Sequence, residues 1–191
     1  LEECRKAGHE DRALMFCSLS KVTFPGAGVA AMAASRRNID YILKNMFPMI
    51  ISFDKLNQVR HIRFLKDMDG LAAHMEKHRA LLEPKFRAVL AILDEGLSGC
   101  GSIARWTKPN GGYFLSLYTL GGCAKRTVQL CREAGVVLTD AGAAYPYGVD
   151  PQDSNIRIAP TFPPLDELET ASRLLCVCVR IATLEKLLQR Q

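Results

Sequence analysis

The chain has 191 residues, of which 48% are hydrophobic and 24% charged, which is enough for one good core or for one domain with part of another. The net charge of +5 comes from 25 basic and 20 acidic residues without an arginine- or lysine-rich block, so the composition does not indicate a nucleic-acid partner. No apolar run approaches the ~18 residues of a membrane-spanning helix.

The seven cysteines are scattered, odd in number and lack a C-x-x-C pair. This pattern argues against a disulfide framework or a zinc site and favours a reducing cytoplasm. Cys176 and Cys178 lie in an expected helix, and we predict core thiols rather than metal ligands. The chain starts without methionine or a signal-peptide pattern, and we expect it to be part of a longer protein.

The first elements expected are two short buried strands, at residues 12–17 and 29–34. Ser18-Leu19-Ser20-Lys21 and a Pro-Gly-Ala-Gly turn lie between them. Because ligands gather at the carboxyl ends of strands in α/β sheets, residues 18–21 are a candidate binding loop. Ser35 can cap the following helix, which Pro48 should end.

A long helix is predicted over residues 70–95, with Asp69 as its cap and Gly96 at its end. Apolar residues recur in it at steps of three and four, a pattern typical of one buried helix face. It would extend about 40 Å at about 1.5 Å per residue, which suits a helix linking two lobes. Pro84 should kink it.

The rest of the chain has an α+β pattern. Strands are expected at residues 103–106, 112–117, 136–138 and 155–159, and a helix at residues 123–134. Pro163 and Pro164, followed by Asp166 and Glu167, predict the start of the last helix, because prolines and acidic residues favour a first turn.

Two groups of residues have candidate chemistry. A lysine at the end of a buried strand is costly when charged, unless its amine is covalently engaged, and the serines near Lys21 could hold a phosphate. Taken alone, the segment is more often a polar loop with a solvated lysine. Arg157 alternates with apolar residues and is either a solvent-exposed edge arginine or a bidentate clamp for a carboxylate.

Together these motifs resemble a known family. Ser18-x-Ser20-Lys21, Asn155-x-Arg157 and the Pro-Asn-Gly-Gly-Tyr-Phe segment at 109–114 occur in its order, and Gly-Val at 135–136 opens a further family segment. The chain resembles the C-terminal half of a fold-type I aminotransferase that depends on pyridoxal 5'-phosphate (PLP), in the aspartate-aminotransferase-like branch. The resemblance implies an α/β fold with the end of the large-domain sheet at 1–68, a linking helix at 69–97 and a small α+β domain at 98–191.

The resemblance also implies roles for individual residues. Lys21 would hold PLP as an internal aldimine, and its released amine would act as general base and acid. Ser18 and Ser20 would lie at the cofactor phosphate, and Arg157 would hold the substrate α-carboxylate. The implied reaction moves an amino group between an amino acid, with aspartate as a candidate, and a 2-oxo acid. A homodimer is expected by resemblance alone.

The sequence departs from the family in three places. Val29 stands where an arginine usually pairs with the phosphate. Arg60 and Arg63, the nearest candidates for a dicarboxylate-binding arginine, are expected to be helical already. The family's ring-stacking aromatic and its acidic partner of the pyridine nitrogen precede the lysine by more than the twenty residues available here. Two alternatives therefore stay open: the effector domain of a transcriptional regulator, or a catalytically inactive fragment.

His74 and His78 lie four residues apart on the long helix, a spacing that is compatible with a metal. They lack a third ligand, and His78 falls on the apolar face. A packed or solvated helix face is the favoured interpretation, and no metal is predicted.

Overall fold

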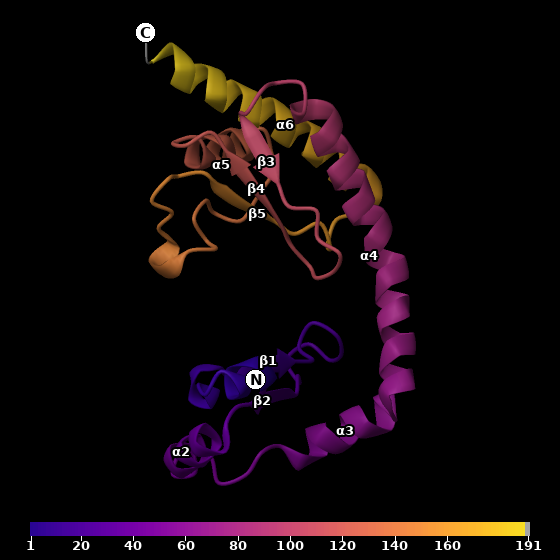
Figure 1. Cartoon of the computed structure of the whole chain (residues 1–191). Helices are drawn as coiled ribbons and strands as arrows, with labels where there is room; N and C mark the ends of the chain where they lie inside the picture. Colours follow the sequence, from indigo (N-terminus) through magenta and orange to yellow (C-terminus); the bar gives the residue numbers. More distant parts are fainter. Residues whose placement is uncertain (190–191) are drawn as a thin grey trace. The chain divides into compact units, whose positions relative to one another are not determined.

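The computed structural model describes residues 1–189 and divides the chain into two compact units, unit 1 (Leu1–His78) and unit 2 (Arg79–Gln191). The long helix α4 (Met68–Leu97) starts in unit 1 and ends in unit 2 (Figure 1). Each unit is described by itself below. None of the helices in the described residues is long and apolar enough to cross a membrane.

Unit 1 consists of short elements around one hairpin. A short helix α1 (Glu2–Lys6) and a 3-10 turn (Glu10–Arg12) precede β1 (Met15–Ser18), which pairs antiparallel with β2 (Ala30–Ala33). Helices α2 (Arg36–Met46) and α3 (Lys55–Leu65) follow. Helix α2 begins at the predicted position, because the Ser35 side chain accepts the N–H of Asn38. The Asp54 side chain caps α3 in the same way by accepting the N–H of Asn57.

The expectation of two buried strands in unit 1 was wrong. All four residues of β1 are exposed, and Phe16 keeps 72% of its surface accessible. β2 is exposed at three of its four positions. A two-stranded hairpin has two faces, and no described element of unit 1 covers either of them enough to exclude water. Asn57 and His61 are the only buried side chains among the described residues of unit 1.

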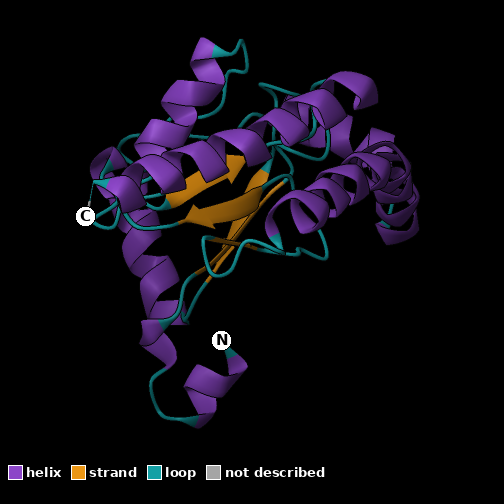
Figure 2. Cartoon of the chain, turned by 90° about the horizontal axis from the view of Figure 1, so that it is seen from above, coloured by secondary structure: helices purple, strands orange, loops and turns teal. Residues whose placement is uncertain are grey.

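Unit 2 is a two-layer α/β structure. Its antiparallel sheet has the order β3 (Ala104–Trp106), β4 (Leu115–Thr119), β5 (Asn155–Ile158), drawn in orange in Figure 2. Helices α5 (Ala124–Glu133) and α6 (Leu165–Leu188) and the end of α4 pack on one face of this sheet. The predicted strand at 136–138 does not form, because no neighbouring strand pairs with it among the described residues.

Every buried apolar side chain of the described residues belongs to unit 2. The alternation of β4, with Leu115 and Leu117 buried and Ser116 and Tyr118 partly exposed, points one side of the sheet into this core. Cys176 and Cys178 are both buried, on either side of α6, as core thiols. Burial raises the pKa of Cys176 to about 11, so this thiol stays protonated at neutral pH.

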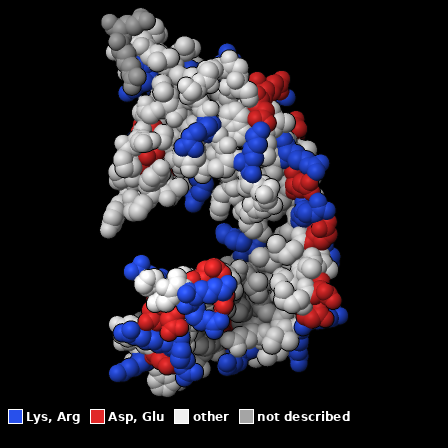
Figure 3. Space-filling view, viewed as in Figure 1, with Lys and Arg blue, Asp and Glu red and all other residues white. Residues whose placement is uncertain are grey.

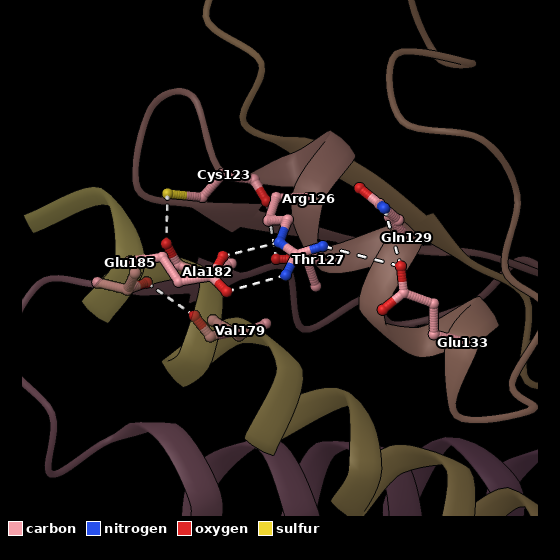
Figure 4. Close-up of polar contacts among 9 residues, drawn as sticks. Cys123, Arg126, Thr127, Gln129, Glu133, Val179, Ala182 and Glu185 are labelled. Carbon is pink, nitrogen blue, oxygen red and sulfur yellow. Dashed lines mark hydrogen bonds and ion pairs between the residues drawn. The ribbon is translucent and has the colours of Figure 1, made fainter. Parts of the chain in front are cut away.

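An ion pair joins α5 to α6 at the edge of this core. Figure 4 shows Arg126 facing Glu185, with Nε–Oε2 and Nη2–Oε1 distances of 2.7 and 2.9 Å. Their hydrogen bonds raise the pKa of Arg126 and lower that of Glu185. Beside this pair, the Cys123 thiol donates to the carbonyl of Ala182. The two helices are thus held together by polar contacts as well as by apolar packing.

Helix α4 differs from its prediction at both ends. Asp67, rather than Asp69, caps it, because the Asp67 Oδ1 accepts the N–H of Gly70 at 2.8 Å. Gly96 does not end the helix but lies inside it, where an added Cβ would come within 2.8 Å of the Cys176 Sγ. The helix continues through Pro84. The apolar pattern predicted burial of Val89 and Leu93 correctly, whereas Met75 remains 41% exposed.

Charges of both signs alternate on the face of the chain in Figure 3, without a broad area of one sign. Several are paired within one helix or between neighbours, as Arg36 is with Asp40 and Arg37 with Asp11. These pairs are exposed, and such pairs stabilise proteins by less than about 1 kcal/mol.

Candidate functional site

The predicted binding loop is the connection between β1 and β2. It spans residues 19–29, and the Leu19 N–H donates to the Val29 carbonyl at 2.8 Å, which continues the ladder of the hairpin by one pair. Ser18, Ser20 and Lys21 therefore lie at the end of β1, but on an antiparallel hairpin rather than on a parallel strand pair.

The two serines come together beside Lys21. Their Oγ atoms are 2.8 Å apart, and the Ser20 N–H donates to the Ser18 Oγ at 3.1 Å. The side chains of both serines and of Lys21 are exposed in this chain, contrary to the expected burial of the lysine. Two adjacent hydroxyls that are open to solvent can turn their hydrogens to an incoming anion.

A tight turn sets the backbone on which Lys21 is carried. The Leu19 carbonyl accepts the N–H groups of both Val22 and Thr23 at 2.9 Å. Two donors on one carbonyl fix the peptide units on either side of Lys21 in a single helical-type turn. The lysine side chain thus leaves from a defined backbone rather than from a free loop.

Gly28 makes the loop compact next to Ser20. A Cβ at position 28 would lie 2.3 Å from the Ser20 Oγ, so only glycine fits there. The buried Asn57 of α3 donates its amide to the Ala27 carbonyl at 2.7 Å and holds this part of the loop. Two hydroxyls beside a glycine backbone fit a phosphate group. Val29 contributes no positive charge to bind that phosphate. The sequence did not indicate that Asn57 would hold this loop; it showed only that Asn57 lies near the start of a helix.

His74 and His78 lie side by side on α4, with their Nε2 atoms 3.2 Å apart. The described residues contain no group of three or more histidine, cysteine or acidic side chains that could hold an ion. Both imidazoles contact the Val22 carbonyl instead, next to Lys21. Both side chains are partly buried, as in the packed form of the predicted packed or solvated helix face, but the sequence gave no indication that they pack on the candidate loop.

Arg157 belongs to unit 2 and lies on β5, opposite Ser116 of β4. Its guanidinium carbon is 4.9 Å from the centroid of the Phe114 ring, a cation–π contact that holds the side chain. Its buried Nε has no hydrogen-bond partner among the described residues. An arginine that is oriented by an aromatic ring can bind a carboxylate through its guanidinium.

Arg157 also lines a cleft of about 540 Å³ in unit 2, a volume in the range of small-molecule sites. The cleft lies between the segment at 135–139, the end of β5 and the first turns of α6. Asp166 and Glu167 also line the cleft and add negative charge to it.

Asp150 fixes the turn that leads into β5. Its carboxylate accepts the backbone N–H groups of Gln152, Ser154 and Asn155 at 2.9, 2.7 and 2.8 Å. Burial by itself raises the pKa of Asp150, but these hydrogen bonds outweigh burial and hold the pKa below its ordinary value. The sequence analysis did not single out Asp150, which sets the start of the strand that carries Arg157.

Comparison with known proteins identifies the family. All of residues 1–191 match the aspartate amino-transferase family. The chain belongs to this family. A protein from Mycolicibacterium smegmatis that is provisionally named an aminotransferase is 50% identical over 182 residues, which are 95% of this chain and 42% of that protein.

Solved structures agree with this assignment. The crystal structure of an aspartate transaminase from Corynebacterium glutamicum is 42% identical, with a TM-score of 0.89 over 95% of this chain and 43% of that one. LysN, an α-aminoadipate aminotransferase from Thermus thermophilus complexed with N-(5'-phosphopyridoxyl)-L-leucine, has the same fold at 22% identity, with a TM-score of 0.75 over 95% of this chain and 45% of that chain.

The family member described here therefore has the α/β fold of the C-terminal part of the aminotransferases. It spans less than half the length of these relatives. The predicted resemblance to the C-terminal half of an aspartate-aminotransferase-like protein is confirmed.

Proposed function

We propose that the protein to which this chain belongs is a PLP-dependent aminotransferase that moves an amino group between an amino acid and a 2-oxo acid. The observation that carries the proposal is the placement of Lys21 beside two hydroxyls whose oxygens are 2.8 Å apart, in a chain of the aspartate amino-transferase family. The phosphopyridoxyl compound in the Thermus thermophilus relative supports the choice of cofactor.

The residues of unit 1 bind the cofactor in this proposal. Ser18 and Ser20 donate hydrogen bonds to its phosphate, and the compact backbone at Gly28 lets that group approach. Lys21 holds the cofactor through its Nζ. When bound, PLP supplies an electron sink that stabilises negative charge on the substrate Cα.

Lys21 and Arg157 have further roles in the proposed reaction. The Nζ of Lys21, once released, takes the proton from the substrate Cα and returns it at the other end of the shift, so it acts as both base and acid. Arg157 binds the substrate α-carboxylate with the two parallel N–H groups of its fork. The neighbouring Phe114 ring keeps that fork oriented.

The remaining assignments are part of the same proposal. Residues 1–68 are assigned to the large cofactor domain, residues 69–97 to the linking helix and residues 98–191 to the small domain. A cytoplasmic homodimer is expected. Aspartate is the first amino donor to test, because the Corynebacterium glutamicum relative is an aspartate transaminase. The named relatives are aminotransferases, which favours this proposal over a regulator.

The test uses the complete natural protein with added PLP. Wild-type protein is expected to develop visible cofactor absorbance, and borohydride should fix the cofactor on Lys21, as read by peptide mass spectrometry. Lys21→Ala should lose both signals, whereas Lys55→Ala, at the start of α3, should keep them. Absence of fixed cofactor on Lys21 in the wild-type protein would reject the enzyme hypothesis, leaving an inactive fragment or regulator.

A further inference from the structure

Three of the four histidines of the chain contact Val22 or Thr23, the two residues that directly follow Lys21. His74 and His78, on the first turns of α4, reach the Val22 carbonyl with Nε2–O distances of 2.6 and 3.0 Å. His61, on α3, contacts the Thr23 hydroxyl with an Nε2–Oγ1 distance of 2.7 Å. We call His61, His74 and His78 the histidine clamp.

The proton positions on the α4 pair follow from their shared partner. A carbonyl oxygen only accepts, and it has two lone pairs, so each of the two Nε2 atoms carries a hydrogen and donates it to Val22. The 3.2 Å between these Nε2 atoms results from both rings converging on one oxygen. Because both Nε2 lone pairs are used by N–H bonds, this pair faces Val22 as donors and not as metal ligands.

His61 contacts Thr23, the residue after Val22, and its Nε2 accepts a hydrogen bond instead of donating one. Its Nδ1 lies 2.8 Å from the carbonyl of Asn57, which only accepts, so Nδ1 carries the hydrogen. In the neutral ring, Nε2 can only accept, so the single hydrogen of the Thr23 hydroxyl is shared between this nitrogen at 2.7 Å and the Leu19 carbonyl at 3.1 Å. His61 is only 4% exposed, and its ring is buried within the turn of α3 that faces the loop.

Aromatic rings hold the imidazoles in place. Phe24 packs edge-on against His61 with ring centroids 5.2 Å apart, and Phe64 does the same with His74 at 5.0 Å. The rings of His74 and His78 meet at nearly a right angle, with centroids 4.7 Å apart. Such contacts restrict ring rotation, so the N–H groups stay directed at residues 22 and 23.

We propose that the histidine clamp consists of positioning residues, which lock the backbone after Lys21 and so fix the direction in which its amine leaves the loop. The proposal rests on the proposed function, in which Lys21 bears the cofactor. Lys21 lies between two fixed points: the Leu19 carbonyl, which binds the N–H groups of residues 22 and 23, and the clamp, which binds the Val22 carbonyl and the Thr23 side chain. A lysine on a fixed backbone samples fewer directions, and preorganised groups react faster.

The test compares matched substitutions in the complete natural protein. His74→Leu and His78→Leu remove the N–H donor but keep bulk, whereas His74→Gln and His78→Gln replace it with an amide N–H in a similar position. His9→Leu is the control, because this fourth histidine lies in the turn after α1 and is exposed. Thermal midpoints identify any variant that does not fold, and the glutamine variant at that position then carries the comparison.

The first readout needs no cofactor. Hydrogen–deuterium exchange of the peptide covering residues 19–25 should be about tenfold faster in the leucine variants, as expected for the loss of one hydrogen bond, and close to wild type in the glutamine variants. The second readout is kinetic: the leucine variants should lower kcat about tenfold with little change in KM, and glutamine should restore most of it.

The outcomes separate the two proposals. Wild-type protein that fixes no PLP on Lys21 rejects the proposed function, and the exchange data then report on the clamp alone. Leucine variants that match His9→Leu in exchange, or glutamine variants that behave like leucine, overturn the clamp. A rise in KM alone, without a fall in kcat, also overturns it, because a misdirected Lys21 affects the proton-transfer step rather than substrate binding.

Discussion

At the scale of single residues, the candidate chemistry depends on two side chains, Lys21 and Arg157, and on the neighbours that orient them. Lys21 is carried by a turn whose carbonyl at Leu19 binds two N–H groups. Arg157 is held by the Phe114 ring, while its Nε stays without a hydrogen-bond partner among the described residues. The backbone of Lys21 and the guanidinium of Arg157 are thus oriented by their neighbours.

Replacement of Arg157 tests its role as a fork. Arg157→Lys keeps the positive charge but replaces two parallel donors by a point charge, so KM for the amino acid should rise by about 10- to 100-fold with a smaller change in kcat. Arg105→Lys is the matched control, because Arg105 lies on β3, at the other edge of the same sheet, and its guanidinium carbon is 3.9 Å from the centroid of the Tyr118 ring. Steady-state kinetics with both substrates decides the matter, and an unchanged KM would remove Arg157 from the site.

At the scale of elements, the start of β5 depends on one carboxylate. The Asp150 carboxylate accepts three backbone N–H groups within the next five residues, and its pKa is lower than the ordinary value because these hydrogen bonds favour the charged form more than burial disfavours it. The strand register that places Arg157 opposite Ser116 follows directly after this turn. The same turn is also held by the N–H groups of residues 122–124, which donate to Asp153.

Asp150→Asn should therefore destabilise unit 2 in a pH-dependent manner. At pH 7 the loss should be about 1–3 kcal/mol, because an amide cannot accept from all three donors. A lowered folded pKa stabilises the protein above the ordinary aspartate value of about 3.9, and the advantage disappears as the pH falls through the folded pKa. Urea-denaturation midpoints of wild type and variant should thus differ at pH 7 and differ less near pH 3.

Asp94→Asn supplies the control for this measurement. Asp94 pairs with Lys108 on the surface, and exposed pairs stabilise by less than about 1 kcal/mol. An equal midpoint difference for Asp150→Asn at both pH values would show that its carboxylate charge is not what stabilises the turn.

At the scale of the whole molecule, the two units differ in how they bury apolar surface. Unit 2 contains all the buried apolar side chains of the described residues, whereas in unit 1 Met49, Ile51 and Leu56 are each more than 80% exposed. Burial of apolar surface is the main favourable contribution to folding. The 191 residues by themselves therefore supply a folding driving force mainly to unit 2.

This difference predicts the behaviour of the 191-residue chain when it is produced alone. Amides in β4, β5 and α6 should exchange hydrogen slowly, while those in β1, β2 and α2 should exchange near the rate of an unfolded chain. Hydrogen exchange with peptide-level mass spectrometry measures both sets in one experiment. Equal protection of the two sets would contradict the link between burial and stability drawn here.

The sequence by itself determined the features that depend on residues close together in the chain. Helix starts at Ser35 and Pro164, the strand at Arg157 and the family motifs could all be predicted, because caps, alternation and turns are local. The roles proposed for Ser18, Ser20, Lys21 and Arg157 come from those motifs and stay predictions.

Only the tertiary structure decided the features that join distant residues. It exposed β1, which local pattern had indicated as buried, and brought Gly96 against Cys176. It also placed His74 and His78 on the carbonyl of Val22, more than fifty residues away in the chain. Burial, close approach and shared hydrogen-bond acceptors depend on which elements pack together, and the packing of distant segments leaves no signal in the spacing of the residues within each segment.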